Sequence, residues 1–150
     1  MTDAPVAQSP PVPPTWVVDT NIVLDLWVFD DPRVGALREA LTRPDARWLA
    51  TAPMREELAR VLTYPRLVRR QPLAPERAQA VLAAYDAAVT WCEPAPRARF
   101  VCSDGDDQRF IDLAVAHRSR LISKDRAVLR LARRLAGVGV EVRSAWPPPC

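Results

Sequence analysis

The sequence lacks several features that would place it in other functional classes. It has no run of about 20 apolar residues, which a membrane-spanning helix requires. Its first residues lack the basic and apolar segments of a signal peptide, so we expect a cytoplasmic protein without a membrane partner. The three cysteines show no CxxC spacing, which argues against a disulfide framework or a zinc site. His117 is the only histidine, so catalysis by a pair of histidines is excluded, and neither a P-loop nor a GxGxxG motif is present.

Length and composition favour one globular domain between two short tails. The chain has 150 residues, 49% of them hydrophobic, which is enough to build a core. Residues 1–14 carry many prolines and little that can pack, so we expect a disordered tail, a domain at 15–145 and a second tail at 146–150. The net charge is +3, and Lys124 is the only lysine, so arginine supplies almost all the basic side chains that could meet phosphate.

Apolar runs alternate with stretches of helical periodicity along the domain. Continuous apolar runs predict buried strands at 16–18, 47–51, 99–102, 120–123 and 138–142. Helical patterns bounded by proline or capping residues cover 21–29, 33–42, 53–62, 75–90, 126–135 and the segment from the turn at 103–105 to residue 117. Strands that alternate with helices indicate an α/β fold with a parallel sheet of about five strands, covered on both faces.

Acidic residues follow the predicted strands closely. Asp19 comes directly after the first strand, and Asp125 lies just beyond the fourth. Asp107 begins the helix after the predicted strand 99–102. Sites in open parallel sheets form at the carboxyl ends of the strands, so we expect these three carboxylates to converge if their strands are neighbours.

Each of these acids also has a purely structural explanation. Asp19 and Asp125 are suitable helix N-caps. Glu57 lies at the edge of the apolar face of helix 53–62, where it can be an ordinary boundary carboxylate, whereas Glu56 points toward water. Because Thr20 can cap the first helix in place of Asp19, the cap alone does not explain the polar residues there.

The acidic group around residue 107 leaves one choice open. Asp104, Asp106, Asp107 and Asp112 lie near the start of one helix, where negative charge is favourable for the helix dipole. Asp112 points away from the apolar face. Asp106 and Asp107 both point close to that face, so helical geometry does not choose between them.

Several carboxylates at one point need a counter-charge. Two like charges about 4 Å apart repel by about 4 kcal/mol at an effective dielectric near 20. A divalent cation with a preference for hard oxygen ligands, Mg²⁺ or Mn²⁺, would relieve that repulsion. Such ions activate water and stabilise charge on phosphate, so the pattern favours one- or two-metal phosphodiester chemistry.

Four sequence motifs, in the right order, resemble those of the PIN domain family. They are 16–21 (WVVDTN), 57–62 (ELARVL), 104–114 (DGDDQRFIDLA) and 121–126 (LISKDR). The resemblance extends over about residues 16–143 and is strongest to the branch described as toxins of bacterial toxin–antitoxin systems. It implies a three-layer α/β/α, Rossmann-like fold and Mg²⁺- or Mn²⁺-dependent cleavage of RNA.

The resemblance also assigns roles to residues. Its four acids fall on Asp19, Glu57, Asp107 and Asp125 as metal ligands and catalytic groups, which selects Asp107 over Asp106. Its accompanying polar residues fall on Thr20, Asn21 and Ser123, which would orient the acids or water. We also expect arginines beside the site to hold the RNA backbone, namely Arg55, Arg109 and Arg126.

Partners and alternatives follow from the same resemblance. It implies a small antitoxin protein that blocks the site, and often a homodimer.

A non-catalytic RNA-binding module that keeps the fold is the main alternative function. A haloacid-dehalogenase-like phosphatase would need a second aspartate two residues after Asp19, where this chain has Asn21. Residues 64–96 match no motif, so their role stays open.

Overall fold

A computed structural model describes residues 14–146 of the chain. The strands are β1 (Thr15–Val18), β2 (Arg47–Ala50), β3 (Val89–Trp91), β4 (Arg120–Ile122) and β5 (Glu141–Arg143). The helices are α1 (Thr20–Trp27), α2 (Gly35–Leu41), α3 (Ala52–Val61), α4 (Pro75–Ala88), α5 (Gln108–His117), α6 (Arg126–Leu129) and α7 (Ala132–Ala136). Two short 3₁₀ helices, η1 (Pro32–Val34) and η2 (Gly105–Asp107), precede α2 and α5. Most of the two expected tails, 1–13 and 147–150, lies outside the described residues.

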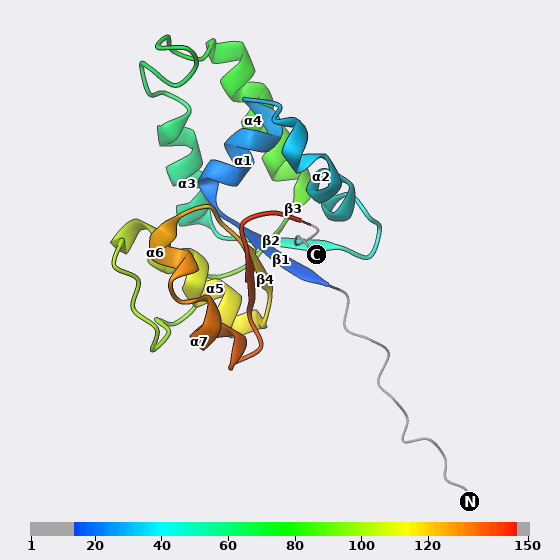
Figure 1. Cartoon of the computed structure of the whole chain (residues 1–150). Helices are drawn as coiled ribbons and strands as arrows, with labels where there is room; N and C mark the ends of the chain where they lie inside the picture. The colour runs from blue at the N-terminus through cyan, green and yellow to red at the C-terminus, as the bar shows by residue number, and fades with distance from the viewer. Residues whose placement is uncertain (1–13, 147–150) are drawn as a thin grey trace, which may run out of the picture.

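All five strands are parallel and follow the order β3-β2-β1-β4-β5. Helices cover both faces of this sheet, which confirms the expected three-layer α/β/α architecture (Figure 1). Strand β1 lies at the centre, between β2 and β4, with Val18 opposite Ile122. The carboxyl ends of β1 and β4 therefore lie next to each other. Among the described residues, no helix is both long and apolar enough to cross a membrane.

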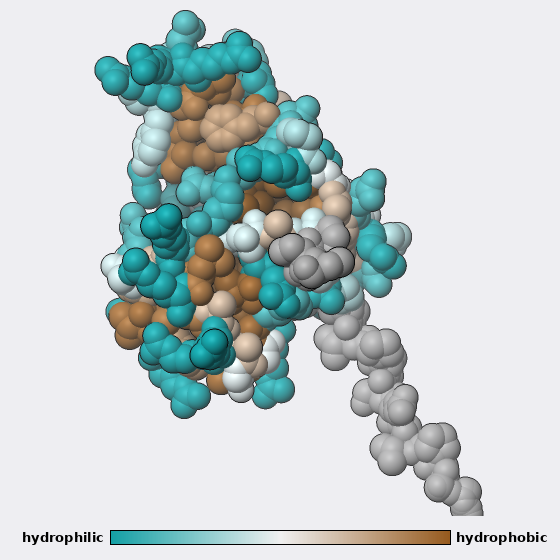
Figure 2. Space-filling view, in the orientation of Figure 1, coloured by the Kyte–Doolittle hydropathy of each residue, from teal (hydrophilic) through white to brown (hydrophobic). Residues whose placement is uncertain are grey.

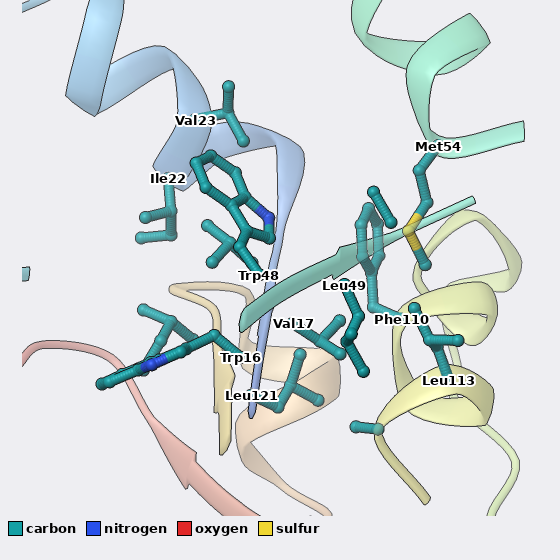
Figure 3. Packing of buried hydrophobic residues seen from close by; sticks show 14 of the residues in the cluster. Trp16, Val17, Ile22, Val23, Trp48, Leu49, Met54, Phe110, Leu113 and Leu121 are labelled. Carbon is teal, nitrogen blue, oxygen red and sulfur yellow. The ribbon is translucent and has the colours of Figure 1, made fainter. Parts of the chain in front are cut away.

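The core fills the space between sheet and helices on each side. Figure 3 shows Trp48 beside Ile22 and Val23 of α1, while Leu49 points the opposite way, toward Phe110 of α5. This alternation follows from the two-residue period of a strand, which sends neighbouring side chains to opposite faces. Trp48 also stacks on Trp27 and meets Tyr85 of α4 edge to face, which joins α1, β2 and α4.

The residues at the two domain boundaries make contacts with the domain. Pro14, at the end of the expected first tail, accepts a hydrogen bond on its carbonyl from Arg47 N at 3.0 Å. Trp146, at the start of the expected second tail, packs edge to face on Trp16, with ring centroids 4.9 Å apart. Arg120 lies against both indole rings. The packed part of the chain thus extends to Trp146.

The third strand is not where the apolar pattern placed it. Helix α4 ends at Ala88, and Val89–Trp91 forms β3 against β2, although Val89 and Thr90 were expected to end that helix. The run Val-Thr-Trp consists of β-branched and aromatic residues, which suit a strand better than the end of a helix. The helical periodicity of the preceding residues concealed this short edge strand.

Residues 99–102, expected to be a strand, form no ladder because a side chain binds their backbone. Gln108 accepts a hydrogen bond on Oε1 from Cys102 N at 2.7 Å and donates from Nε2 to the Phe100 carbonyl at 2.8 Å. These bonds satisfy the backbone groups that a neighbouring strand would otherwise use. Phe100 and Cys102 are buried while Val101 is 62% exposed, so the alternation of a strand is present without the strand itself.

The expected helix 126–135 is broken into α6 and α7. Leu131 N bonds to the Val128 carbonyl at 2.9 Å, a spacing of three residues that tightens the chain between the two helices. This turn lets Val128, Leu131 and Leu135 all point into the core, where they are at most 4% exposed. The final strand, β5, is correspondingly shorter than expected and displaced toward the carboxyl terminus.

The role of Gln108 gives a prediction for stability. Replacing Gln108 with Ala leaves the buried Cys102 N and the Phe100 carbonyl without their partners, and each unpaired buried group costs about 1–3 kcal/mol. We expect the free energy of unfolding, measured by urea denaturation, to fall by about 2–4 kcal/mol. Gln79→Ala, at an exposed position of α4, is the control. An equal effect of the two substitutions would contradict the assigned role.

Candidate acidic site at the carboxyl edge of the sheet

Asp19 and Asp125 are brought together by the pairing of β1 with β4. Asp19 N donates to the Ile122 carbonyl at 2.9 Å, which extends the ladder to the acid itself. The Ser123 hydroxyl donates to Asp19 Oδ2 at 2.6 Å and accepts from Asp125 N at 3.1 Å. Ser123 is fully buried, so this one hydroxyl ties the two acidic segments together away from water.

Both of these acids also cap helices, which is the structural role that the sequence suggested for them. Asp125 Oδ1 accepts from Ala127 N at 2.8 Å at the start of α6. Asp19 Oδ1 accepts from Asn21 N at the longer distance of 3.4 Å at the start of α1. An N-cap needs neither the short hydrogen bond from Ser123 nor the burial of Asp19, because most N-caps lie at the surface.

Asp107 reaches the same place from helix α5. The helix is anchored by Phe110, Ile111 and Leu113, which are at most 2% exposed, and Figure 3 shows Phe110 and Leu113 turned toward the sheet. Asp107 itself is 7% exposed, whereas its neighbour Asp106 faces solvent. Its Oδ2 atom is buried with no hydrogen-bond donor among the described residues.

Asp104 joins this group from the turn before α5. One carboxylate oxygen from each of Asp104, Asp107 and Asp125 can lie within 4.8 Å of the others. Asp104 is exposed and also caps η2, because its Oδ1 accepts from Asp106 N at 3.0 Å. The sequence places Asp104 in the acidic group at the start of this helix but leaves open whether Asp104 or Asp106 assists a metal site. Its spacing of three residues from Asp107 was the signal available.

Glu57 is attached to the site through Thr20. The Thr20 hydroxyl donates to Glu57 Oε1 at 3.0 Å, and both residues are buried. Thr20 directly follows Asp19 at the start of α1, so this bond connects α3 to the end of β1. Arg109 donates to the Pro53 carbonyl at 3.1 Å, and its positive charge acts on Glu57. Glu56 is exposed, as its position on the helix predicted.

Burial raises the pKa values of Asp19, Glu57 and Asp107, and the neighbouring carboxylates add to the effect. Burial is the largest cause that raises the pKa of Asp19, and its bond from Ser123 opposes that effect. Burial also raises the pKa of Glu57, which the Thr20 bond and Arg109 partly offset. For Asp107, burial, the adjoining Asp125 carboxyl group and the charge of Asp19 together raise the pKa from 3.8 to about 8.

The remaining expected site residues take different positions. Asn21 is exposed and contributes its backbone N–H to Asp19, with no side-chain hydrogen bond among the described residues. Arg55 is held by Asp86 of α4 through bonds of 2.6 and 2.9 Å, so its guanidinium is already paired. Arg126 is exposed at the first turn of α6, close in sequence to Asp125.

An ion pair between a buried acid and an exposed lysine, next to the site, was not anticipated from the sequence. Lys124 Nζ lies 2.5 Å from Oδ2 of Asp25, whose side chain is 8% exposed. Asp25 lies on α1 among apolar residues, and an acid inside an apolar helical pattern was the signal available. Lys124 stands between Ser123 and Asp125, so the pair fixes the loop that carries them.

The donor set fits a hard divalent cation. The residues that converge offer carboxylate oxygens, which Mg²⁺ and Mn²⁺ prefer over nitrogen or sulfur ligands. The unpartnered Oδ2 of Asp107 lies in the interior without a proton donor, which is unusual for a buried polar atom. Asp104, Asp107 and Asp125 could therefore hold a metal ion.

A family comparison identifies this arrangement. The family model described as PIN domain matches residues 15–127, three quarters of the chain and all of the acidic residues above. The chain belongs to the PIN domain family. The resemblance seen in the four motifs is thereby confirmed.

A solved structure is similar to this PIN domain. It is a chain of the crystal structure of VapBC2 from Rickettsia felis bound to a DNA fragment from their promoter. The TM-score is 0.60 at 13% sequence identity, over 85% of this PIN domain chain and 98% of that chain. At that identity the likeness shows the shared fold. No curated protein matches the sequence.

The pKa of Asp107 predicts how stability depends on pH without metal. A carboxyl group whose pKa is raised by folding binds more protons in the folded state, so the free energy of unfolding falls as pH rises through about 8. In EDTA we expect urea denaturation to show lower stability at about pH 8 than at about pH 5. Adding Mg²⁺ should reverse the loss, because the cation stabilises the ionised acids.

Two variants control this measurement. Asp107→Asn removes the titrating group and should flatten the pH dependence between about pH 5 and 8. Asp106→Asn alters the exposed neighbour and should leave the dependence in place. Stability that rises steadily with pH in EDTA would contradict the predicted sign.

Proposed function

We propose that this PIN domain is a Mg²⁺- or Mn²⁺-dependent endoribonuclease that hydrolyses RNA phosphodiester bonds. Membership of the PIN family supports a nuclease in general. The assignment of Asp19, Glu57, Asp107 and Asp125 as its metal ligands and catalytic groups is part of the proposal. Asp104 joins the proposed ligand set because of its position beside Asp107 and Asp125.

The single observation that carries the proposal is the environment of Asp107. Its carboxyl group is buried beside Asp125, carries an oxygen without a donor, and has a pKa raised to about 8. A protein that used these acids only for structure would gain stability by replacing one of them with a neutral residue. Retaining the repulsion is consistent with a site built for a cation.

The chain's own residues would divide the work of the reaction. A bound divalent cation would activate water and offset the negative charge that develops on the phosphate. Ser123 fixes the rotamer of Asp19, and Thr20 fixes Glu57, so both acids are held before substrate arrives. Glu57, whose pKa is raised by burial, is suited to accept a proton from the attacking water. Arg109, close to Glu57, can meet the phosphate backbone.

We further propose that the protein is the toxin of a toxin–antitoxin pair and acts in the cytoplasm. Its motifs resemble the toxin branch of the family, and the similar solved chain comes from a VapBC2 complex. The expected partner is a small antitoxin that covers the acidic site. A homodimer is expected on the same grounds. The paired state of Arg55 makes Arg109 and Arg126 the better candidates for contacts with RNA.

Cleavage of RNA by purified protein tests the enzyme assignment. We expect mixed single-stranded and structured RNAs to be cut with Mg²⁺ or Mn²⁺ and to stay intact in EDTA. Asp107→Asn should lower kcat by about a hundredfold or more, because it removes an acid that touches the cation. Asp106→Asn should retain most activity, since its side chain faces solvent.

A second matched pair lies on α3, where Glu57→Gln should abolish most cleavage and Glu56→Gln should not. Single-stranded DNA of the same sequence tests the preference for RNA. Full cleavage by Asp19→Asn or Asp107→Asn would refute the mechanism. Binding of RNA without any metal-dependent cleavage would favour the non-catalytic module.

Expression in a bacterial host tests the toxin assignment. Induction of the unaltered chain should arrest growth and reduce total RNA integrity, whereas the Asp19→Asn variant should allow growth. Asp106→Asn, expressed at the same level, should remain toxic because it leaves the buried acids unchanged. Growth arrest by Asp19→Asn at equal expression would show that toxicity does not come from cleavage.

A further inference from the structure

The loop between α3 and α4 forms a protruding hairpin far from the sheet (Figure 1). It connects Val61, the end of α3, to Pro75, the start of α4. At its tip, Val68 N donates to the Gln71 carbonyl at 3.0 Å and Gln71 N donates to the Val68 carbonyl at 2.8 Å. Arg69 and Arg70 are therefore the two central residues of a tight turn.

Both central residues adopt a backbone conformation that arginine disfavours. Arg69 has φ of 47° and Arg70 has φ of 64°. Two-residue hairpins with positive φ at both positions select glycine, asparagine and aspartate, because Cβ lies too close to the following carbonyl oxygen there. Glycine has no Cβ, and the short side chains of asparagine and aspartate offset the cost by local hydrogen bonds. Only four non-glycine residues in the described chain have positive φ, and two of them are these adjacent arginines. The turn thus holds two arginines at positions where its own folding favours other residues.

The hairpin is strongly basic. The segment 60–77 contains five arginines (Arg60, Arg66, Arg69, Arg70 and Arg77) and one acid, Glu76. No carboxylate among the described residues forms an ion pair with any of these five arginines. The positive charge of this segment is therefore left uncompensated and available to an anionic partner.

An open hollow and an exposed aromatic ring accompany these charges. A hollow of about 420 Å³ is lined in part by Arg69, Gln71 and Arg77. Tyr64, at the start of the loop, is 46% exposed. In Figure 2 hydrophilic side chains form the outer rim of the end of the molecule occupied by this loop, above an area of hydrophobic ones. Forked guanidinium groups and an exposed aromatic ring in one loop suit phosphates and an unpaired base.

We propose that the hairpin, residues 64–74, binds the backbone of single-stranded RNA several nucleotides away from the bond that is cut. Arg69 and Arg70 contact successive phosphates, and Tyr64 stacks on a base. Helix α3 rises about 6 Å from Glu57 to its end at Val61, and the loop continues beyond it, so an RNA strand must extend well past the acidic site to reach the tip. The proposal rests on the proposed nuclease function and specifies its substrate as extended, single-stranded RNA.

Binding measured without cleavage separates this inference from catalysis. The probe is a fluorescent, unstructured RNA of two dozen or so nucleotides, bound to full-length Asp19→Asn protein in EDTA. The test variant Arg69→Asn, Arg70→Gly removes both charges and supplies the residues that the turn prefers, so its thermal unfolding midpoint should not fall. The control Arg133→Ala, Arg134→Ala removes two exposed arginines from α7, at the opposite end of the molecule.

The expected result is a loss of affinity confined to the hairpin variant. Its Kd should rise by about tenfold at moderate salt, and the slope of log K against log salt should become shallower by about 1.4, because two phosphate contacts are lost. The control should match the parent protein. Equal affinity and equal salt slope in the hairpin variant would overturn the inference, and would leave a protein partner as the reason for the basic tip.

Cleavage assays then show how the hairpin serves the site. In otherwise unaltered protein, Arg69→Asn, Arg70→Gly should raise KM for the long RNA with kcat retained, and should leave kcat/KM for a tetranucleotide unchanged. Arg69→Lys, Arg70→Lys should recover part of the affinity, since it restores charge without the fork. An equal loss on the tetranucleotide would contradict the proposed distance. If RNA binds through the hairpin but no metal ion supports cleavage, the proposed nuclease function fails, while the binding of RNA by the hairpin stands.

Discussion

Strands β1 and β4 lie side by side in parallel, and their ladder continues to Asp19, whose backbone N–H donates to the Ile122 carbonyl. Every other relation in the acidic site depends on this pairing. It sets Ser123 next to Asp19, and Ser123 in turn fixes Asp125. A shift of β4 by one residue relative to β1 would turn Leu121 to the opposite face of the sheet and carry the acids apart. The hydrophobic core thus determines where the charges meet.

The site stores unfavourable electrostatic energy that the core must offset. Asp19, Glu57 and Asp107 are buried, and burial raises the pKa of each. Two neutral donors, Thr20 and Ser123, satisfy part of this set, while Asp107 keeps an oxygen without a donor. A buried polar network stabilises a fold only when all of its polar atoms have hydrogen-bond partners, so this network does not serve stability alone. Its carboxylate oxygens are suited to bind a cation.

The parts of this arrangement that were predictable from sequence are those that depend on periodicity. Continuous apolar runs located β1, β2 and β4, and the order of strands and helices gave the layered parallel fold. The same rule placed a false strand at 99–102, because it does not register that Gln108 satisfies the backbone of that segment. It missed β3 because Val89–Trp91 continues a helical pattern and is too short to show a period of its own. Contacts between residues distant in sequence, such as Asp25 with Lys124, have no local signal beyond an acid on an apolar face.

The two charged regions of the molecule lie apart, and a net charge of +3 conceals this separation. Acids gather at the carboxyl edge of the sheet, while five arginines without carboxylate partners in the described chain lie between the last turn of α3 and the first turn of α4. Unpaired carboxylates repel a phosphate backbone, so the acidic site cannot attract RNA until a cation reverses its local charge. An arginine tip has no such requirement. In the proposed nuclease, capture of the strand would therefore depend on the arginines of the hairpin, and hydrolysis on a cation held by the acids. The strained backbone at Arg69 and Arg70 would be retained because these two side chains serve capture.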